Sequence, residues 1–293
     1  MKRVLISAAG TMASISYIKL LKEKGFYVIG VNAVKSDLAI HFCDEFHVVP
    51  VVSDTDDYIK AIEALDFNVF VPWLDEEHIL FATRNVSFKS KILTSDPNSI
   101  LIATDKIRTY DFCVANGIEI SQRVKTVPAF VRKRFSRGSK FAFVENDQNK
   151  LDALDSEDYL KQEILKGQEY TVDILCDMQG NYIYAVPRKR LEAINVSTEG
   201  QVDMNADIIN YCKKIVEKLP FKGCINIQVF NTEKGLFLVE INPRLAGTSI
   251  LSIKAGFDLL TDSIKLFLGE NISRDYHAKD KLKMLRYYEE MYV

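Results

Sequence analysis

Two segments near the end of the chain carry oxygen-bearing side chains at a spacing that could bind a metal ion. Asn226 and Gln228 alternate with apolar residues in the first segment, and Glu240 and Asn242 do so in the second. Side chains of a β-strand point to opposite faces in turn, so a hairpin turning within residues 231–235 would bring all four onto one face. Their oxygens suit Mg²⁺, which takes one or two carboxylates and completes its shell with phosphate oxygens. A hairpin with a solvated polar face explains the same alternation.

The composition disfavours several other kinds of site. The five cysteines are scattered and the four histidines form no H-x-x-H or H-E-x-x-H pattern, so neither a zinc site nor a redox dithiol is expected. Lys and Arg total 38 against 40 Asp and Glu, which leaves a net charge of −2 and no broad positive field for a nucleic acid. The metal should therefore be bound by oxygen ligands, and nucleic acid is not an expected partner.

The hydropathy pattern argues against a membrane partner. No apolar run approaches the roughly 20 residues that span a bilayer. The apolar start of the chain, residues 4–6, is too short for a secretion signal and leads directly into a strand-turn-helix pattern. We therefore expect a soluble, cytoplasmic protein.

The elements that must position the candidate ligands begin with an alternating pattern. Strands are predicted at 4–7, 27–31, 45–49 and 69–72, and helices at 13–24, 57–65 and 76–81, which is typical of a parallel α/β lobe. The first strand-helix turn has one glycine instead of G-x-G-x-x-G, and the second strand ends in Asn32 instead of an acidic residue. These departures favour a structural lobe over a nicotinamide-dependent dehydrogenase.

The rest of the chain predicts a lid followed by a second sheet. A new unit opens at Asp96-Pro97, and a further helix begins at 104–105 and ends near 117. Residues 128–163 hold two short strands, 129–132 and 140–144, and a polar stretch, with too little apolar surface for a core of their own. Strands at 169–176, 182–186, 225–230 and 236–241 and a helix at 207–219 then predict an antiparallel sheet with helices on one side.

A short string at the second ligand segment resembles a known family signature. The sequence Glu240-Ile241-Asn242-Pro243-Arg244 follows a strand that carries Asn-x-Gln. It resembles the metal-binding signature of the ATP-grasp family, in the branch of the carbamoyl-phosphate synthase large subunits, and the chain as a whole resembles a stand-alone carboxylate–amine ligase. The resemblance implies an α/β fold that is α+β in its C-terminal half. Its parts would be a pre-grasp α/β domain at 1–103, a linker helix and lid at 104–165, and a catalytic antiparallel-sheet domain at 166–293.

The resemblance also implies a nucleotide site. The residues that match the ATP-contacting positions are Lys106, Arg132, Ser139, Glu163, Ile164, Leu165 and Glu169. The two basic residues would reach the phosphates, residues 163–165 the adenine edge, and Glu169 the ribose hydroxyls. The lid departs from the family because Lys133 replaces a proline and only Gly138 remains of a glycine-rich loop. Side chains such as Ser139 would then have to replace backbone amides as phosphate donors.

The resemblance implies a reaction as well. It assigns Gln228, Glu240 and Asn242 as metal ligands and Arg244, Arg188 and Arg190 as catalytic residues. The expected cofactors are ATP and Mg²⁺, with two ions and with Mn²⁺ as an alternative ion. A small-molecule carboxylate would be activated as an acyl phosphate and joined to an amine or thiol, with no protein nucleophile required. The identity of both substrates and a homodimer stay open, and the glycine-poor lid leaves a non-catalytic nucleotide-binding or regulatory module as the alternative.

Overall fold

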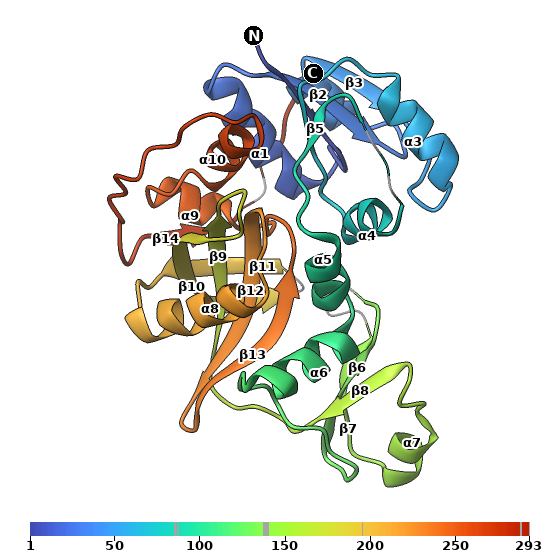
Figure 1. The fold of residues 1–293 in the computed structure, drawn as a ribbon, viewed down its shortest axis with the longest axis vertical. Helices are drawn as coiled ribbons and strands as arrows, with labels where there is room; N and C mark the ends of the chain where they lie inside the picture. The colour runs from blue at the N-terminus through green and yellow to red at the C-terminus, as the bar shows by residue number, and fades with distance from the viewer. Residues whose placement is uncertain (85, 87, 137–140, 195, 288, 293) are drawn as a thin grey trace.

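The chain folds around three β-sheets (Figure 1). The structure, a computed structural model, describes residues 1–84, 86, 88–136, 141–194, 196–287 and 289–292. Within these ranges no helix is both long and apolar enough to cross a membrane.

The N-terminal sheet is parallel, as predicted. Its strand order is β3 (Glu45–Val48), β2 (Tyr27–Asn32), β1 (Arg3–Ile6), β4 (Val69–Val71) and β5 (Lys91–Ile92). The helices of this lobe are α1 (Met12–Glu23), α2 (Asp37–Phe42), α3 (Thr55–Glu63) and α4 (Asp75–Thr83). Alternate residues of β1 face different layers, since Val4 packs in the cluster of α1 and Leu5 in the cluster of α3. From β1 the chain continues to β2 and β3 on one side of β1, and β4 and β5 then add on its other side. Such a change of direction in the strand order opens a crevice at the carboxyl ends of β1 and β4.

Two helices lead from this lobe into the lid. They are α5 (Pro97–Thr104), which Asp96 caps, and α6 (Lys106–Asn116), which Asp105 caps and Gly117 ends at a φ of 62°. The lid sheet has the order β7 (Ala142–Glu145), β6 (Ala129–Lys133) and β8 (Tyr159–Gln162), with α7 (Gln148–Ala153) beside it. The polar stretch expected after β7 thus contains a capped helix, because Asp147 accepts hydrogen bonds from the amides of the first turn. The buried core of the lid is small and consists of Ala129, Val131 and Leu151.

The C-terminal sheet is antiparallel and has six strands. Their order is β13 (Gly235–Asn242), β12 (Gly223–Thr232), β9 (Gln168–Cys176), β10 (Tyr182–Ile194), β11 (Val196–Val202) and β14 (Lys283–Leu285). The helices of this part are α8 (Ala206–Lys218), α9 (Ile250–Lys254) and α10 (Leu259–Phe267).

The prediction that helices cover only one side of this sheet was wrong. Ile174 of β9 packs with Ile215 of α8, whereas the adjacent Leu175 packs with Ile264 of α10. Successive residues of a strand point to opposite faces, so α8 and α10 cover opposite faces. The periodicity of the strands could not show this, because α9 and α10 follow the signature string and were not recognised.

Candidate active site

The predicted meeting of four oxygen-bearing side chains on one hairpin is confirmed in register. Gln228 of β12 lies directly opposite Glu240 of β13, and Asn226 lies opposite Asn242. The apolar residues between them point the other way, into the core that α8 covers. The hairpin therefore presents all four polar side chains on the face away from α8.

A β-bulge produces this register. From the turn, the ladder pairs Val229 with Leu238, then skips Val239 and pairs Gln228 with Glu240. Without the skipped residue, Gln228 would face Val239, and Glu240 would point to the opposite face. The sequence pattern showed the alternation within each strand but not the bulge that brings the strands into phase.

Arg132 of the lid strand β6 holds this bulge. Its Nη1 donates to the carbonyl oxygen of Val239 at 2.8 Å, and its Nη2 donates to Oε1 of Gln162 at 2.7 Å. Arg132 is 6% exposed, and burial lowers its pKa while the Glu240 carboxylate opposes that shift. Arg132, the predicted phosphate contact, thus lies beside the candidate metal ligands and hydrogen-bonds to the backbone of the strand that carries Glu240.

One row of paired residues crosses four strands of the sheet. Arg188 of β10 pairs with Thr171 of β9, Thr171 pairs with Gln228, and Gln228 pairs with Glu240. Residues paired across neighbouring strands share a face. The structure therefore brings the predicted Arg188 onto the same face as the candidate metal ligands.

Arg188 is not at the surface of that face. It is 2% exposed, its Nη2 lies 2.9 Å from Oδ2 of Asp173, and its Nη1 donates to the carbonyl and hydroxyl oxygens of Thr248 at 3.0 and 2.8 Å. Asp173 also accepts hydrogen bonds from Ser249 at 2.7 Å and from Asn226 at 2.8 Å. Arg188 and Asp173 thus form a buried network on the same face of the sheet, in contact with Asn226 of the hairpin.

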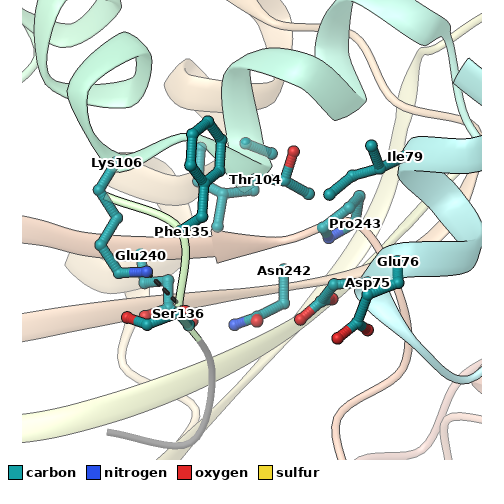
Figure 2. A pocket seen from close by; sticks show the side chains of 12 residues that line it. Asp75, Glu76, Ile79, Thr104, Lys106, Phe135, Ser136, Glu240, Asn242 and Pro243 are labelled. Carbon is teal, nitrogen blue, oxygen red and sulfur yellow. Dashed lines mark hydrogen bonds between the residues drawn. The ribbon is translucent and has the colours of Figure 1, made fainter. Parts of the chain in front are cut away.

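Lys106 lines a pocket between the lobes (Figure 2). Figure 2 shows Lys106 and Glu240 on one side, Asp75 and Glu76 on the other, and Asn242 between them. We call this the Lys106 pocket; it is lined by these five residues together with Ile79, Ala103, Thr104, Phe135, Ser136, Ile241 and Pro243.

The charge of Lys106 is poorly hydrated. The Nζ of Lys106 donates to the carbonyl oxygen of Ser136 at 2.6 Å, and Lys106 is 8% exposed. Burial lowers the pKa of Lys106, and the nearby Glu240 carboxylate opposes that shift. A buried ammonium beside a carboxylate would interact strongly with an anionic group entering the pocket.

Arg244 ties the signature string to the N-terminal lobe. Its Nε and Nη2 donate to the two carboxylate oxygens of Asp75 at 2.6 and 3.0 Å, and Nη2 lies 3.5 Å from Oδ1 of Asn242. Such a two-point contact fixes the plane of the guanidinium as well as its position. Asp75, at the first turn of α4, was not singled out from the sequence because its partner is 169 residues away in the chain.

The predicted adenine segment connects β8 to β9. The carbonyl oxygen of Glu163 accepts a hydrogen bond from Ser121 Oγ at 2.7 Å, which holds the start of this segment, and Ile164 is 38% exposed. Leu165 follows in the same connection. The predicted Ser139 lies outside the described residues.

Glu169 and Arg190 form an ion pair on the same face, between Oε1 and Nη1 at 2.5 Å. The sequence interpretation grouped Arg190 with Arg188 as a catalytic residue. The structure places it instead against the predicted ribose acceptor Glu169, because β10 runs antiparallel to β9 and the residues next to them, Lys189 and Tyr170, are paired.

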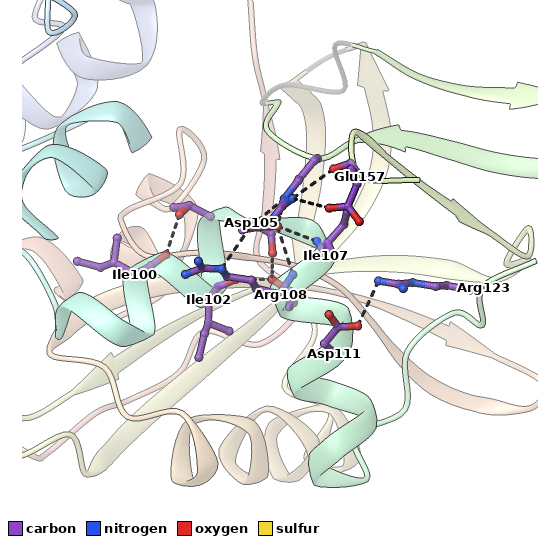
Figure 3. Close-up of polar contacts among 11 residues, drawn as sticks. Ile100, Ile102, Asp105, Ile107, Arg108, Asp111, Arg123 and Glu157 are labelled. Carbon is purple, nitrogen blue, oxygen red and sulfur yellow. Dashed lines mark hydrogen bonds and ion pairs between the residues drawn. The ribbon is translucent and has the colours of Figure 1, made fainter. Parts of the chain in front are cut away.

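The lid is attached through Asp105 (Figure 3). Its carboxylate accepts hydrogen bonds from the amides of Ile107 and Arg108 at 3.0 and 3.2 Å, as an N-cap does. The same carboxylate forms a two-point contact with Arg134, with Nη2 at 2.7 Å. The sequence analysis placed a helix start at 104–105 but did not identify the contact with the arginine, which directly follows lid strand β6.

The donor set fits a magnesium ion that arrives with a phosphate. Among the described residues no three His, Cys, Asp or Glu side chains cluster as a metal-binding group. The hairpin offers one carboxylate, Glu240, and the amide oxygens of Gln228 and Asn242. Magnesium accepts such a partial set when phosphate oxygens complete its octahedron.

Comparison with known proteins agrees with this geometry. Residues 155–290 match the family model described as ATP-grasp in the biosynthetic pathway with Ter operon. The chain is 28% identical over 186 residues to the carbamoyl phosphate synthase large chain of Clostridium beijerinckii, covering 57% of this chain and 17% of that one. It is 24% identical over 306 residues to the large chain of Thermoplasma acidophilum, covering 89% and 28%. The chain therefore spans less than a third of the length of these relatives.

Solved structures share the fold. N5-carboxyaminoimidazole ribonucleotide synthetase from Thermotoga maritima matches with a TM-score of 0.68 at 18% identity, covering 94% of this chain and 78% of that one. Biotin carboxylase from Campylobacter jejuni matches with a TM-score of 0.72 at 15% identity, covering 93% and 72%. The signature string lies within the residues that match the ATP-grasp family model, and the chain as a whole shares the fold of these two enzymes.

Proposed function

We propose that this chain is an ATP-dependent ligase that joins a small-molecule carboxylate to an amine, or to a thiol, through an acyl phosphate. The observation that carries the proposal is the bulged hairpin, which places Glu240 opposite Gln228 and next to the buried Lys106. That arrangement concentrates oxygen ligands and positive charge where terminal phosphates of a nucleotide would need both.

Each residue has a defined part in this proposal. Gln228, Glu240 and Asn242 would hold Mg²⁺, as two ions or with Mn²⁺ in its place, and the metal would neutralise phosphate charge when bound. Lys106 and Arg132 would face the phosphates from the lid side. Arg244, fixed by Asp75, would stabilise the transferring phosphoryl group.

The adenosine half of the nucleotide would lie along the β8–β9 connection. Residues 163–165 would meet the adenine edge, and Ser139 would assist at the phosphates. Glu169 would accept hydrogen bonds from the ribose hydroxyls with the oxygen that does not bind Arg190. Arg188 would support the site through its ion pair with Asp173 rather than touch the phosphates.

The reaction would proceed in two displacements. A carboxylate oxygen of the first substrate attacks the γ-phosphorus, and ADP leaves with the electrons of the broken P–O bond. The amine nitrogen then attacks the acyl carbon, inorganic phosphate leaves, and the nitrogen loses a proton. Closure of the lid would keep water from the acyl phosphate between these steps.

Replacing Glu240 tests the assignment. Glu240→Gln removes the single carboxylate of the hairpin face and should lower Mg²⁺-dependent ADP release, measured with pools of carboxylic acids and amines, by on the order of a thousandfold. Glu233→Gln is the matched control, because Glu233 is exposed in the turn of the same hairpin, and it should retain wild-type activity.

Three outcomes are distinguishable in that experiment. Loss of turnover in Glu240→Gln with an unchanged circular dichroism spectrum supports the ligase. Equal turnover in both variants overturns the assigned site. ATP binding by the wild type without turnover across broad pools indicates the non-catalytic nucleotide-binding module instead. A homodimer and a cytoplasmic location remain predictions, which sedimentation and cell fractionation would test.

A further inference from the structure

A second cavity opens beside the helices that connect the N-terminal lobe to the lid. We call it the hinge pocket, and it encloses about 320 Å³, which is at the lower end of the range for small-molecule sites. Its wall combines helix α4 of the N-terminal lobe, both linker helices and the segment that follows lid strand β6. These parts contribute, among others, Ile79, Leu101, Arg108, Arg134 and Phe135.

The hinge pocket differs from the Lys106 pocket, although the two cavities share part of their walls. Ile79 and Phe135 line both, whereas Glu240 lines only the Lys106 pocket. Lys106 and Arg108 are two positions apart on α6, so their side chains point to different sides of the helix. Their exposure agrees, because Lys106 is 8% exposed and the side chain of Arg108 is 56% exposed. A group bound at Arg108 would therefore lie away from the candidate metal ligands.

Positive charge predominates in the lining of the hinge pocket. Its charged groups among the described residues are Arg108, Arg134 and the single carboxylate of Asp105. That carboxylate already accepts hydrogen bonds from two amides of α6 and from Arg134 (Figure 3). The Nε of Arg108 lies 3.6 Å from it, beyond hydrogen-bonding distance, and within the described part of the chain the Arg108 guanidinium donates no hydrogen bond. Arg108 therefore has donors available for an anion.

The lining of the hinge pocket favours a small anion that carries an apolar group. A guanidinium binds a carboxylate through two parallel hydrogen bonds, and Arg108 has the donors for both. Leu101, Ile79 and Phe135 supply an apolar wall, and Phe135 is 58% exposed, so a hydrocarbon group would gain by covering it. An amine would instead meet the charges of two arginines.

We propose that the hinge pocket is an effector site for a carboxylate with an apolar side group, and that the bound molecule holds the lid against the N-terminal lobe. The carboxylate would bind Arg108, and the hydrocarbon would lie between Phe135 of the lid and Leu101 of α5. Because this ligand contacts both sides of the hinge, it would bind best to the lid arrangement seen here and would stabilise that arrangement. The inference goes beyond the proposed ligase reaction and requires no turnover.

Binding of two matched probes provides the first test. The probes 4-phenylbutyrate and 4-phenyl-1-butanol share a hydrocarbon group and differ in charge. Titration followed by ligand-observed NMR should give a dissociation constant at least about fivefold lower for the carboxylate. Arg108→Met should reduce that ratio toward one. Arg123→Met is the matched control and should keep the wild-type ratio, because Arg123 is also exposed but pairs with Asp111 and does not line the pocket.

A blocking variant locates the site. Leu101 is half-buried and lines the hinge pocket but not the Lys106 pocket, so Leu101→Trp should fill the cavity. Val114 of α6 is 56% exposed and lines neither pocket, so Val114→Trp is the matched control. Leu101→Trp should weaken phenylbutyrate binding at least about tenfold and Val114→Trp less than about twofold, with ATP binding unchanged in both.

Hydrogen exchange tests the effect on the lid. A ligand that binds one of two states favours that state by a factor of one plus the ratio of its concentration to its dissociation constant. At about five times the dissociation constant, phenylbutyrate should therefore slow exchange of the β6 and β8 amides by up to about sixfold. The amides of β9 and β12 should not change, and in Leu101→Trp the ligand should slow neither group.

The outcomes separate this inference from the ligase proposal. Selective binding of the carboxylate that Arg108→Met and Leu101→Trp both weaken, together with slower exchange in the lid, supports it even if no ADP is released. Equal affinity for acid and alcohol, or displacement of phenylbutyrate by MgADP, overturns the effector site even if the enzyme turns over. Binding that leaves exchange in the lid unchanged overturns the holding role. Arg108→Met, at an exposed position, keeps the test decisive if Leu101→Trp does not fold.

Discussion

Two arginine–aspartate pairs lie on the two sides of the proposed nucleotide site, and they differ in burial. In the C-terminal sheet, the side chains of Arg188 and Asp173 are 2% and 1% exposed. At the lid hinge, those of Arg134 and Asp105 are 24% and 4% exposed. A fully buried charge depends on its partner because it has lost its hydration, whereas a partly hydrated arginine can exchange its partner for water at small cost. We expect the Arg188–Asp173 pair to hold its face of the C-terminal sheet rigid. We expect the Arg134–Asp105 pair, which we call the latch, to open and close.

The apolar packing around the two pairs differs in the same sense. The C-terminal sheet lies between two large buried clusters, one on each face. The lid has a buried cluster of three residues, Ala129, Val131 and Leu151. The contrast indicates that the face proposed to bind the metal is preorganised and that the lid is the part able to move.

The largest predicted effect comes from breaking the buried pair. Arg188→Met leaves Asp173 buried without its counter-ion and should lower the free energy of unfolding by about 3–5 kcal/mol. Urea unfolding followed by circular dichroism measures this change. Lys189→Met is the control, because Lys189 is half-buried on the opposite face and pairs with Asp203 at 3.2 Å. If Arg188→Met lowers the free energy of unfolding no more than Lys189→Met does, Arg188 does not hold this face in place.

A second prediction concerns the pH dependence of stability and a buried histidine of the N-terminal lobe. His78 of α4 is 1% exposed, and burial lowers its pKa to about 4. In the unfolded chain His78 binds a proton near pH 6.5, whereas in the folded chain it does so only near pH 4. The free energy of unfolding should therefore fall as the pH drops from about 6.5 to about 4. The fall should be roughly 2 kcal/mol larger in the wild type than in His78→Gln.

Unfolding midpoints measured between pH 4.5 and 7.5 test whether stability falls toward low pH as expected. His41→Gln, at an exposed position of α2, serves as the control and should keep the wild-type slope. A wild-type slope that His78→Gln leaves unchanged would assign the acid sensitivity to other groups.

The third prediction joins the two regions through the bulge. Arg132→Met removes the donor to the Val239 carbonyl and should weaken the fit of Glu240 opposite Gln228. The Mg²⁺ concentration for half-maximal ATP turnover should rise about tenfold, equivalent to about 1.4 kcal/mol. Lys133→Met, at the next position of the same strand, should leave it unchanged, and equal Mg²⁺ dependence in the two variants would contradict the supporting role of Arg132.

The sequence predicted those features that depend on local periodicity. The parallel lobe, the capped helix at Asp96, the helix start at 104–105 and the alternation of Asn226 and Gln228 each follow from residues within about one element of each other. What escaped prediction depends on distant partners. The bulge at Val239 is invisible to strand periodicity, and Arg244 finds Asp75 across 169 residues. The two-sided covering of the C-terminal sheet was missed because α9 and α10 lie beyond the signature string.

The smallest predicted effect concerns the latch. Arg134→Met removes a two-point contact with Asp105, but Asp105 keeps its amide donors at the start of α6, so the free energy of unfolding should change by less than about 1 kcal/mol. The lid should nevertheless open more often, and amides of β6 and β8 should exchange hydrogen several-fold faster while those of β9 and β12 do not change. Arg108→Met is the control, because Arg108 is 56% exposed and lies 3.6 Å from the same carboxylate. Uniform acceleration in both sheets would mean that the pair stabilises the whole molecule, and the contrast between a fixed face and a releasable lid would then fail.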